Sequence, residues 1–114
     1  MKSDILVNID NLKEIYQIPL SNIPSQDFNI FIQDDEYKFS LQTLSDLKTY
    51  LTITKDNNTI CANAGIKCNV DLTFLSSHPC PFVVFFGALN ESALNNLTYK
   101  DFNQKIGLFY GFMA

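Results

Sequence analysis

The sequence contains no arginine and no tryptophan, and it has a single histidine. All of its 8 basic residues are lysines, against 12 acidic residues, which gives a formal net charge of −4 at pH 7. Proteins bind phosphate backbones mainly through clusters of arginine and lysine. The lack of arginine and the negative charge therefore argue against a nucleic-acid-binding protein.

Long apolar runs are also missing. The most apolar stretch, Pro81 to Leu89, is far shorter than the roughly 20 residues that a helix needs to cross a bilayer. Near the N-terminus, Ile5-Leu6-Val7 is interrupted by Asn8 and Asp10, so it does not make the apolar region of a secretory signal. We therefore expect no membrane association, and either an intracellular product or a component of an assembled particle.

Cysteine is too sparse for a disulfide-stabilised domain. Cys61, Cys68 and Cys80 are odd in number and have no repeated spacing, whereas disulfide scaffolds use an even and denser set. We predict free thiols without a bound metal. Glycine is sparse as well, and its four residues are scattered, so no phosphate-binding loop is present.

The residues that are abundant indicate one well-packed domain. Apolar residues make up 46% of the 114 residues and charged residues 18%, which is unlike a disordered chain. Ten phenylalanines and five tyrosines are many for this length and are typical of strands and interfaces. The length allows one hydrophobic core.

Alternation of apolar and polar residues predicts paired strands. Phe28, Ile30 and Ile32 share one face before the charged turn Asp34-Asp35-Glu36, and Phe31 is the one apolar exception on the opposite, polar face. Tyr37 to Leu41 alternates after the turn. The same arrangement recurs around the polar turn Lys55 to Asn58. Further strands are expected at the following places: 15–20 as an edge strand, Phe82 to Phe86 as a strand covered on both faces, and Ile106 to Tyr110.

These elements predict an all-β fold. We expect a small barrel or sandwich of about seven or eight short antiparallel strands. Thr98-Tyr99-Lys100-Asp101 has the spacing of a capping motif and predicts one short helical turn. Residues 16–114 are expected to form a single β-domain, preceded by residues 1–15 as an N-terminal arm or short helix.

Few residues suggest chemistry. His78 and Cys80 could in principle act as base and nucleophile, but they lie two apart in a proline-rich loop with no acid placed to orient the imidazole. Cys61, Cys68, His78 and Cys80 supply four zinc-ligand types, but their spacings match no zinc-finger pattern. The sequence therefore specifies no catalytic residues, no cofactor and no metal.

The surplus of aromatic residues instead favours a contact surface. Phe109 is expected opposite the core face of the last strand, with clefts beside it at Gly107 and Gly111. In the arm, apolar residues need burial that a neighbouring subunit could supply. The predicted partner contacts are Ile5, Val7, Leu12, Phe31, Phe109 and Phe112.

The order of segments resembles the small baseplate plug proteins of contractile-tailed phages, a family typified by a cyanophage baseplate plug. The resemblance covers about residues 18–112 and rests on strand and turn patterns. The segments that carry it are Ile18-Pro19-Leu20, Asn22 to Ile30, Tyr37 to Leu41, Tyr50 to Asn58, Gly65-Ile66, Asn69 to Leu72, Leu97 to Phe102 and Ile106 to Tyr110.

The resemblance implies a structural protein of the virion, located in the tail baseplate and assembled in the host cytoplasm. It implies contacts with hub and tail-tube proteins within a symmetric assembly, and it brings no catalytic residues. Two other functions fit the residues alone. One is a small-ligand-binding β-barrel whose aromatic side chains line a cavity, and the other is a small cysteine or zinc protein.

Overall fold

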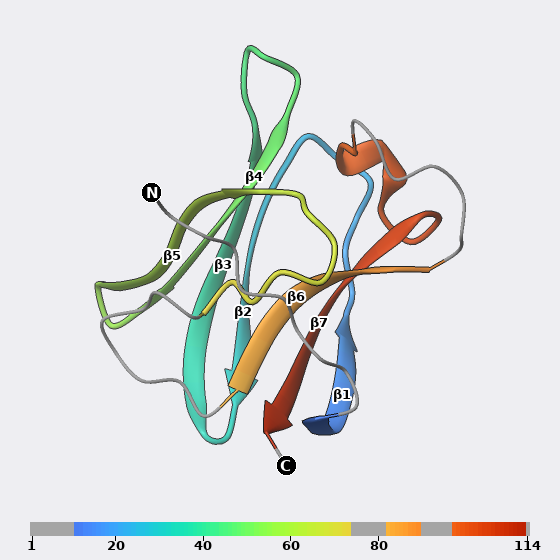
Figure 1. Ribbon diagram of the computed structural model, residues 1–114. Helices are drawn as coiled ribbons and strands as arrows, with labels where there is room; N and C mark the ends of the chain where they lie inside the picture. The colour runs from blue at the N-terminus through green and yellow to red at the C-terminus, as the bar shows by residue number, and fades with distance from the viewer. Residues whose placement is uncertain (1–10, 74–81, 90–96, 114) are drawn as a thin grey trace, which may run out of the picture.

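The computed structural model describes residues 11–73, 82–89 and 97–113, and strands dominate these residues (Figure 1). The elements in chain order are β1 (Leu12–Ile18), β2 (Ser25–Ile32), β3 (Asp35–Thr43), β4 (Thr49–Lys55), β5 (Asn58–Gly65), β6 (Phe82–Ala88), the 3-10 turn η2 (Tyr99–Asp101) and β7 (Ile106–Met113).

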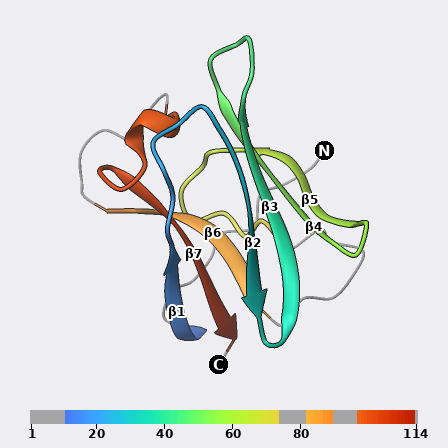
Figure 2. The same cartoon turned by 180° about the vertical axis from the view of Figure 1, so that it is seen from behind.

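The strands form two antiparallel sheets. One sheet has the order β1-β7-β6 and the other has the order β2-β3-β4-β5. The sheets lie in two layers, as Figure 1 and the reverse view in Figure 2 show. The all-β prediction is confirmed, and of its two alternatives the structure is a sandwich, because the sheets do not close into a barrel.

Alternating side chains place the core between the sheets. On β3, Tyr37, Phe39 and Leu41 are buried, whereas Lys38 and Gln42 face solvent. From the opposite sheet, the even-numbered residues of β6 and β7 point inward. The buried members of this single cluster are Ile18, Leu20, Ile32, Tyr37, Phe39, Leu41, Leu51, Ile53, Ile60, Phe82, Val84, Phe86, Phe102, Ile106 and Leu108.

Strand β6 is buried on both faces, as its continuous apolar sequence predicted. Phe82, Val84 and Phe86 face the core, and Phe85 on the other face is still only 2% exposed. Along its open edge, the amides of Asn69 and Leu72 donate to the carbonyls of Phe86 and Val84. The segment after β5 therefore closes this side of the sandwich.

Left-handed backbone at polar residues makes the tight turns. The β2–β3 turn has positive φ at Gln33 and Asp34, and the β4–β5 turn has positive φ at Asp56 and Asn57. Two such residues between antiparallel strands form the type I′ hairpin, whose twist matches that of the strands. The first turn is consequently shorter than expected, because Asp35 already belongs to β3. No described glycine has positive φ.

Strand β1 begins inside the segment expected to be an arm. Residues Leu12 to Ile18 pair with β7, with a register shift between Leu12 and Glu14. The predicted edge strand is therefore present, but it spans Leu12–Ile18 rather than 15–20 and ends before Pro19. Residues 1–10 of the expected arm lie outside the described residues.

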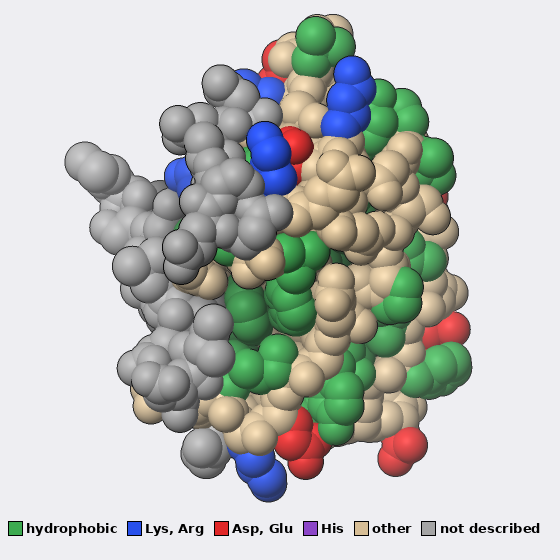
Figure 3. All heavy atoms as spheres, turned by 90° about the vertical axis from the view of Figure 1, so that its right-hand side faces the viewer, with side chains coloured by type: hydrophobic (Ala, Val, Ile, Leu, Met, Phe, Trp, Pro, Cys, Tyr) green, Lys and Arg blue, Asp and Glu red, His purple; other side chains and the backbone are tan. Residues whose placement is uncertain are grey.

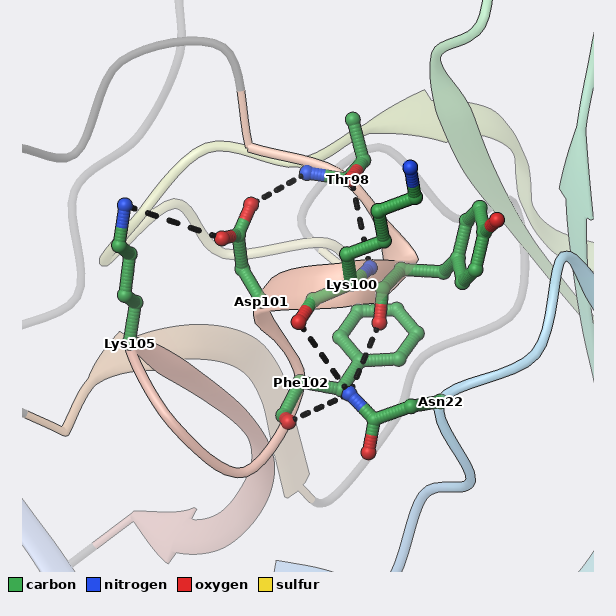
Figure 4. A network of polar contacts seen from close by, with 7 residues as sticks. Asn22, Thr98, Lys100, Asp101, Phe102 and Lys105 are labelled. Atoms are coloured by element: carbon green, nitrogen blue, oxygen red, sulfur yellow. Dashed lines mark hydrogen bonds and ion pairs between the residues drawn. The ribbon is translucent and has the colours of Figure 1, made fainter.

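The predicted helical turn is present as η2, in the connection between β6 and β7. The Thr98 side chain accepts from the amide of Lys100, while Asp101 accepts from the amide of Thr98 at 2.8 Å. This is the capping box that the sequence indicated. Beside it, Asn22 directs its side-chain amide at the end of η2 and donates to the carbonyls of Tyr99 at 3.1 Å and Phe102 at 2.8 Å (Figure 4).

This amide clamp leads to a prediction about stability. Replacing Asn22 by alanine removes a donor shared by several carbonyls, so we expect the free energy of unfolding to fall by about 1–2 kcal/mol. Asn22→Asp keeps the shape but turns a carboxylate oxygen toward the same carbonyls, so its loss should be larger. Urea denaturation at neutral pH measures both. An aspartate variant as stable as the wild type would show that the clamp contributes nothing.

Candidate assembly surface

The described residues do not gather the groups that a metal site needs. Within 11–73, 82–89 and 97–113, no three His, Cys, Asp or Glu side chains form a metal-binding group. Cys61 and Cys68 are half-buried, and burial raises the pKa of Cys68. Cys68 is therefore a protonated thiol at neutral pH, a poor nucleophile and ligand. His78 and Cys80 lie outside the described residues.

Aromatic side chains, which would line a cavity in the small-ligand alternative, pack against one another inside the described part of the chain. Side chains from both sheets pack against one another in one cluster. Phe28 stacks on Phe39 with ring centroids 5.6 Å apart, and Tyr37 meets Phe82 edge-on at 5.0 Å. The aromatic residues that could have lined a cavity therefore fill the core of the described part of the chain.

Exposed apolar side chains are concentrated in a few places on the surface. Figure 3 looks at the side where β1 lies and shows hydrophobic side chains spread over it, with acidic side chains along its lower edge. Of the large apolar side chains that are exposed in the described residues, two lie on β1, one on β2, two in the β3–β4 loop, one in the β1–β2 connection and one after β6. These residues are Ile15, Tyr16, Phe31, Leu44, Leu47, Ile23 and Leu89.

An aromatic cluster links β1 to the end of β7. Tyr16 pairs with Tyr110 in the sheet register, and their rings stack with centroids 5.2 Å apart. Phe112 meets both rings edge-on, at 6.5 Å from Tyr16 and 6.0 Å from Tyr110. The predicted contact Phe112 is half-buried in this cluster. Tyr16 was not among the predicted contacts, and it remains 46% exposed.

The Tyr16 hydroxyl is held by a neighbouring carboxylate. It donates a hydrogen bond of 2.8 Å to Glu14 Oε2, and this bond raises the pKa of Tyr16. Both residues lie on β1, whose outer edge makes no backbone hydrogen bond among the described residues. Among the described residues, β1 is therefore an edge strand that carries one exposed aromatic and one acidic side chain.

Phe109 does not have the clefts that the sequence analysis placed beside it. Its ring lies 3.0 Å from the position of a Cβ on Gly87 and 3.2 Å from that on Gly107. On the other side, Leu12 and Ile15 of β1 fill the space over Gly111. Phe109 also stacks on Phe85 with centroids 5.6 Å apart and is half-buried. The space beside these glycines is therefore occupied by side chains of the same chain, and not left open for a partner.

The remaining predicted contacts have different surroundings. Phe31 is 68% exposed on the outer face of β2, where its cross-strand partner is Glu36. Leu12 is half-buried and packs toward Gly111 within its own domain. Ile5 and Val7 lie outside the described residues. Among the predicted contacts that the structure describes, Phe31 is therefore the one that is mostly exposed to solvent.

The β3–β4 loop, residues 44–48, was not among the predicted contacts either. Leu44 is 49% exposed and Leu47 is 74% exposed. Asp46 organises the loop, because its carboxylate accepts from the amide of Lys48 at 3.0 Å and from the hydroxyl of Tyr50 at 2.6 Å. Two leucines in a polar segment between alternating strands were the available signal.

The Asp46 contact predicts a shift in titration. The hydrogen bond from Tyr50 lowers the pKa of Asp46, so the bond's stabilising effect is present at neutral pH and is lost as the pH falls through that lowered pKa. In Tyr50→Phe we expect the pKa of Asp46 to rise toward its ordinary value. NMR titration of the Asp46 carboxyl measures this change. An unchanged pKa in the variant would remove Tyr50 as its cause.

Comparison with known proteins agrees with this picture of a structural domain. In the described part of the chain, no helix is long and apolar enough to span a membrane. No curated protein matches the chain. The family model described as "Cyanophage baseplate Pam3 plug gp18" matches residues 15–112, which confirms the resemblance seen in the sequence. The chain therefore belongs to this family of cyanophage baseplate plugs and has the structural role in the phage baseplate that the family name states.

Proposed function

We propose that this protein is a plug at the hub end of a phage tail, where it contacts hub or tail-tube proteins and has no catalytic activity. The family match over residues 15–112 is the observation that carries the proposal. The protein would assemble in the host cytoplasm and remain in the virion. It would need no cofactor, because its role is to fill and close a structure.

The open strand edges and exposed side chains suit such a role. The outer edges of β1 and β2 make no backbone hydrogen bonds among the described residues, so a neighbouring chain can complete them. Phe31 on β2 and Tyr16 on β1 supply exposed aromatic area beside these edges. Aromatic residues are enriched at the centres of protein interfaces. In a symmetric assembly, the same edges would be used in every copy.

The partner contacts predicted from the sequence differ in how exposed they are. Phe31 is exposed, and Phe112 and Phe109 are partly accessible beside the aromatic cluster and on the outer face of β7. For Ile5 and Val7 the proposal is that the segment before β1 packs on a neighbouring subunit. Residues 16–114, with β1 starting slightly earlier, would be the folded plug domain.

Binding to purified components tests the proposal. The chain should co-elute in size-exclusion chromatography with the hub or tail-tube protein encoded by the same phage. Phe31→Ser should weaken this binding without changing the melting temperature, because the ring is 68% exposed. Leu89→Ser, which changes another partly exposed residue, serves as the control. Absence of binding to both proteins by the wild-type chain would contradict the proposed contacts.

A further inference from the structure

The β3–β4 loop presents the most exposed apolar side chain of the described residues. Leu47 is 74% exposed and Leu44 is 49% exposed, and the loop that carries them stands away from the two sheets at the top of Figure 1. Neither leucine belongs to the core cluster or to the residues packed against it. The two side chains therefore contribute little to holding this domain together.

The loop is ordered by its own hydrogen bonds. The amide of Leu44 donates to the carbonyl of Lys48 at 3.0 Å, and the amide of Leu47 donates to the carbonyl of Leu44 at 2.9 Å. Asp46 adds its two contacts, to the Lys48 amide and the Tyr50 hydroxyl. A loop closed in this way holds its side chains in a fixed position, which reduces the entropy lost on binding.

The base of the loop is anchored in the domain. The hydroxyls of Thr43 and Thr49 lie 2.9 Å apart, and Thr49 is 1% exposed. Thr49 Oγ1 also accepts from the amide of Tyr99 at 3.1 Å, in the turn η2. The loop is thus connected through Thr49 to η2, which lies between β6 and β7 of the other sheet.

Leu47 occupies a backbone conformation that leucine disfavours. Its φ is 64°, in the left-handed region, where the Cβ of an L-residue lies too close to the following carbonyl oxygen. All the other non-glycine residues with positive φ in the described part of the chain are polar. They are Gln33, Asp34, Asp56, Asn57, Asn63, Asn69 and Asn103. Position 47 alone combines this conformation with an exposed apolar side chain, which benefits neither folding nor solubility.

We propose that the β3–β4 loop is a preformed apolar knob, with Leu47 at its tip and Leu44 beside it, that inserts into an apolar pocket of another baseplate protein. This inference rests on the proposed function. A convex tip needs a concave partner, so two copies of this chain cannot pair loop to loop. Asp46 beside the leucines and the net charge of −4 disfavour an anionic membrane surface as the partner.

The variant Leu47→Asn separates a docking role from a structural one. Asparagine tolerates the left-handed conformation, so the melting temperature of the isolated protein should stay the same or rise. Loss of the apolar tip should reduce the amount of this chain in purified tails about tenfold or more, when the variant complements a phage that lacks the gene. Ile23→Asn, at an exposed apolar residue outside the loop, should be incorporated like the wild type.

Each outcome of this experiment is informative. Incorporation of the Leu47→Asn variant into tails at the wild-type level would contradict the proposal that the loop inserts into a partner's pocket. A lower melting temperature for the variant would assign Leu47 a role in folding instead. If the isolated wild-type chain self-associates in light scattering and Leu47→Asn makes it monomeric, the pocket belongs to a second copy and the assigned partner is wrong. Absence of the wild-type chain from tails would instead contradict the proposed function itself.

Discussion

Replacing Phe85 by alanine is expected to lower the free energy of unfolding by about 3–5 kcal/mol, the range typical of a fully buried phenylalanine. Phe85 lies on the face of β6 opposite the core cluster, yet it is only 2% exposed and stacks on Phe109 at 5.6 Å. Removal of the Phe85 ring should leave a cavity beside the ring of Phe109. Chemical denaturation of the isolated protein, followed by tyrosine fluorescence, measures the change.

Phe31→Ala is the matched control, because it makes the same substitution on another strand. Phe31 is 68% exposed, so its loss should change the free energy of unfolding by no more than about 0.5 kcal/mol. If the two variants were equally stable, the outer face of β6 would not be buried in solution. The pair therefore separates an aromatic residue that stabilises the domain from one available to a partner.

Gly111→Ala should also destabilise the protein strongly. A Cβ at this position would lie 2.7 Å from the carbonyl oxygen of Glu14 and 3.1 Å from Leu12 Cδ1. The first neighbour is backbone, at the register shift between Leu12 and Glu14, and it cannot move without separating β1 from β7. We expect a loss of about 1–3 kcal/mol, as for other overpacked sites.

Gly65→Ala provides the control for the glycine substitution. At Gly65 the nearest atom to a new Cβ is Tyr50 Cε1 at 3.9 Å, an ordinary contact. Alanine there should leave the free energy of unfolding unchanged or raise it by up to about 1 kcal/mol, since glycine is entropically unfavourable in a strand. Thermal melts of both variants test this. A Gly111→Ala protein as stable as Gly65→Ala would show that β1 is not held closely against β7.

Local sequence patterns predicted most of the fold because they act over a few residues. Alternation around Phe39 and Ile53 identified the strands, and Thr98 with Asp101 identified the helical turn. The exact turns were harder, because left-handed pairs such as Gln33 and Asp34 replace the usual glycine. The choice between barrel and sandwich depends on how the strands pair across the whole chain, which no local pattern specifies.

The surface was less predictable, because it depends on contacts between distant segments. Gly111 seemed to leave space beside Phe109, but β1 fills that space with Ile15 and Leu12 from the other end of the chain. The side-chain amide of Asn22 donates to the carbonyl of Phe102, which lies 80 residues away in the sequence. Leu47 was overlooked because a backbone conformation, rather than a residue pattern, makes it unusual.

The central claim, that this protein is a plug in the phage baseplate, is tested most directly by cryo-electron microscopy of purified tails. The measurement compares reconstructions from the wild-type phage and from a phage lacking this gene. We predict density for the β1-β7-β6 and β2-β3-β4-β5 sandwich at the centre of the wild-type baseplate and its loss in the deletion. Identical baseplate density in the two reconstructions would contradict the account.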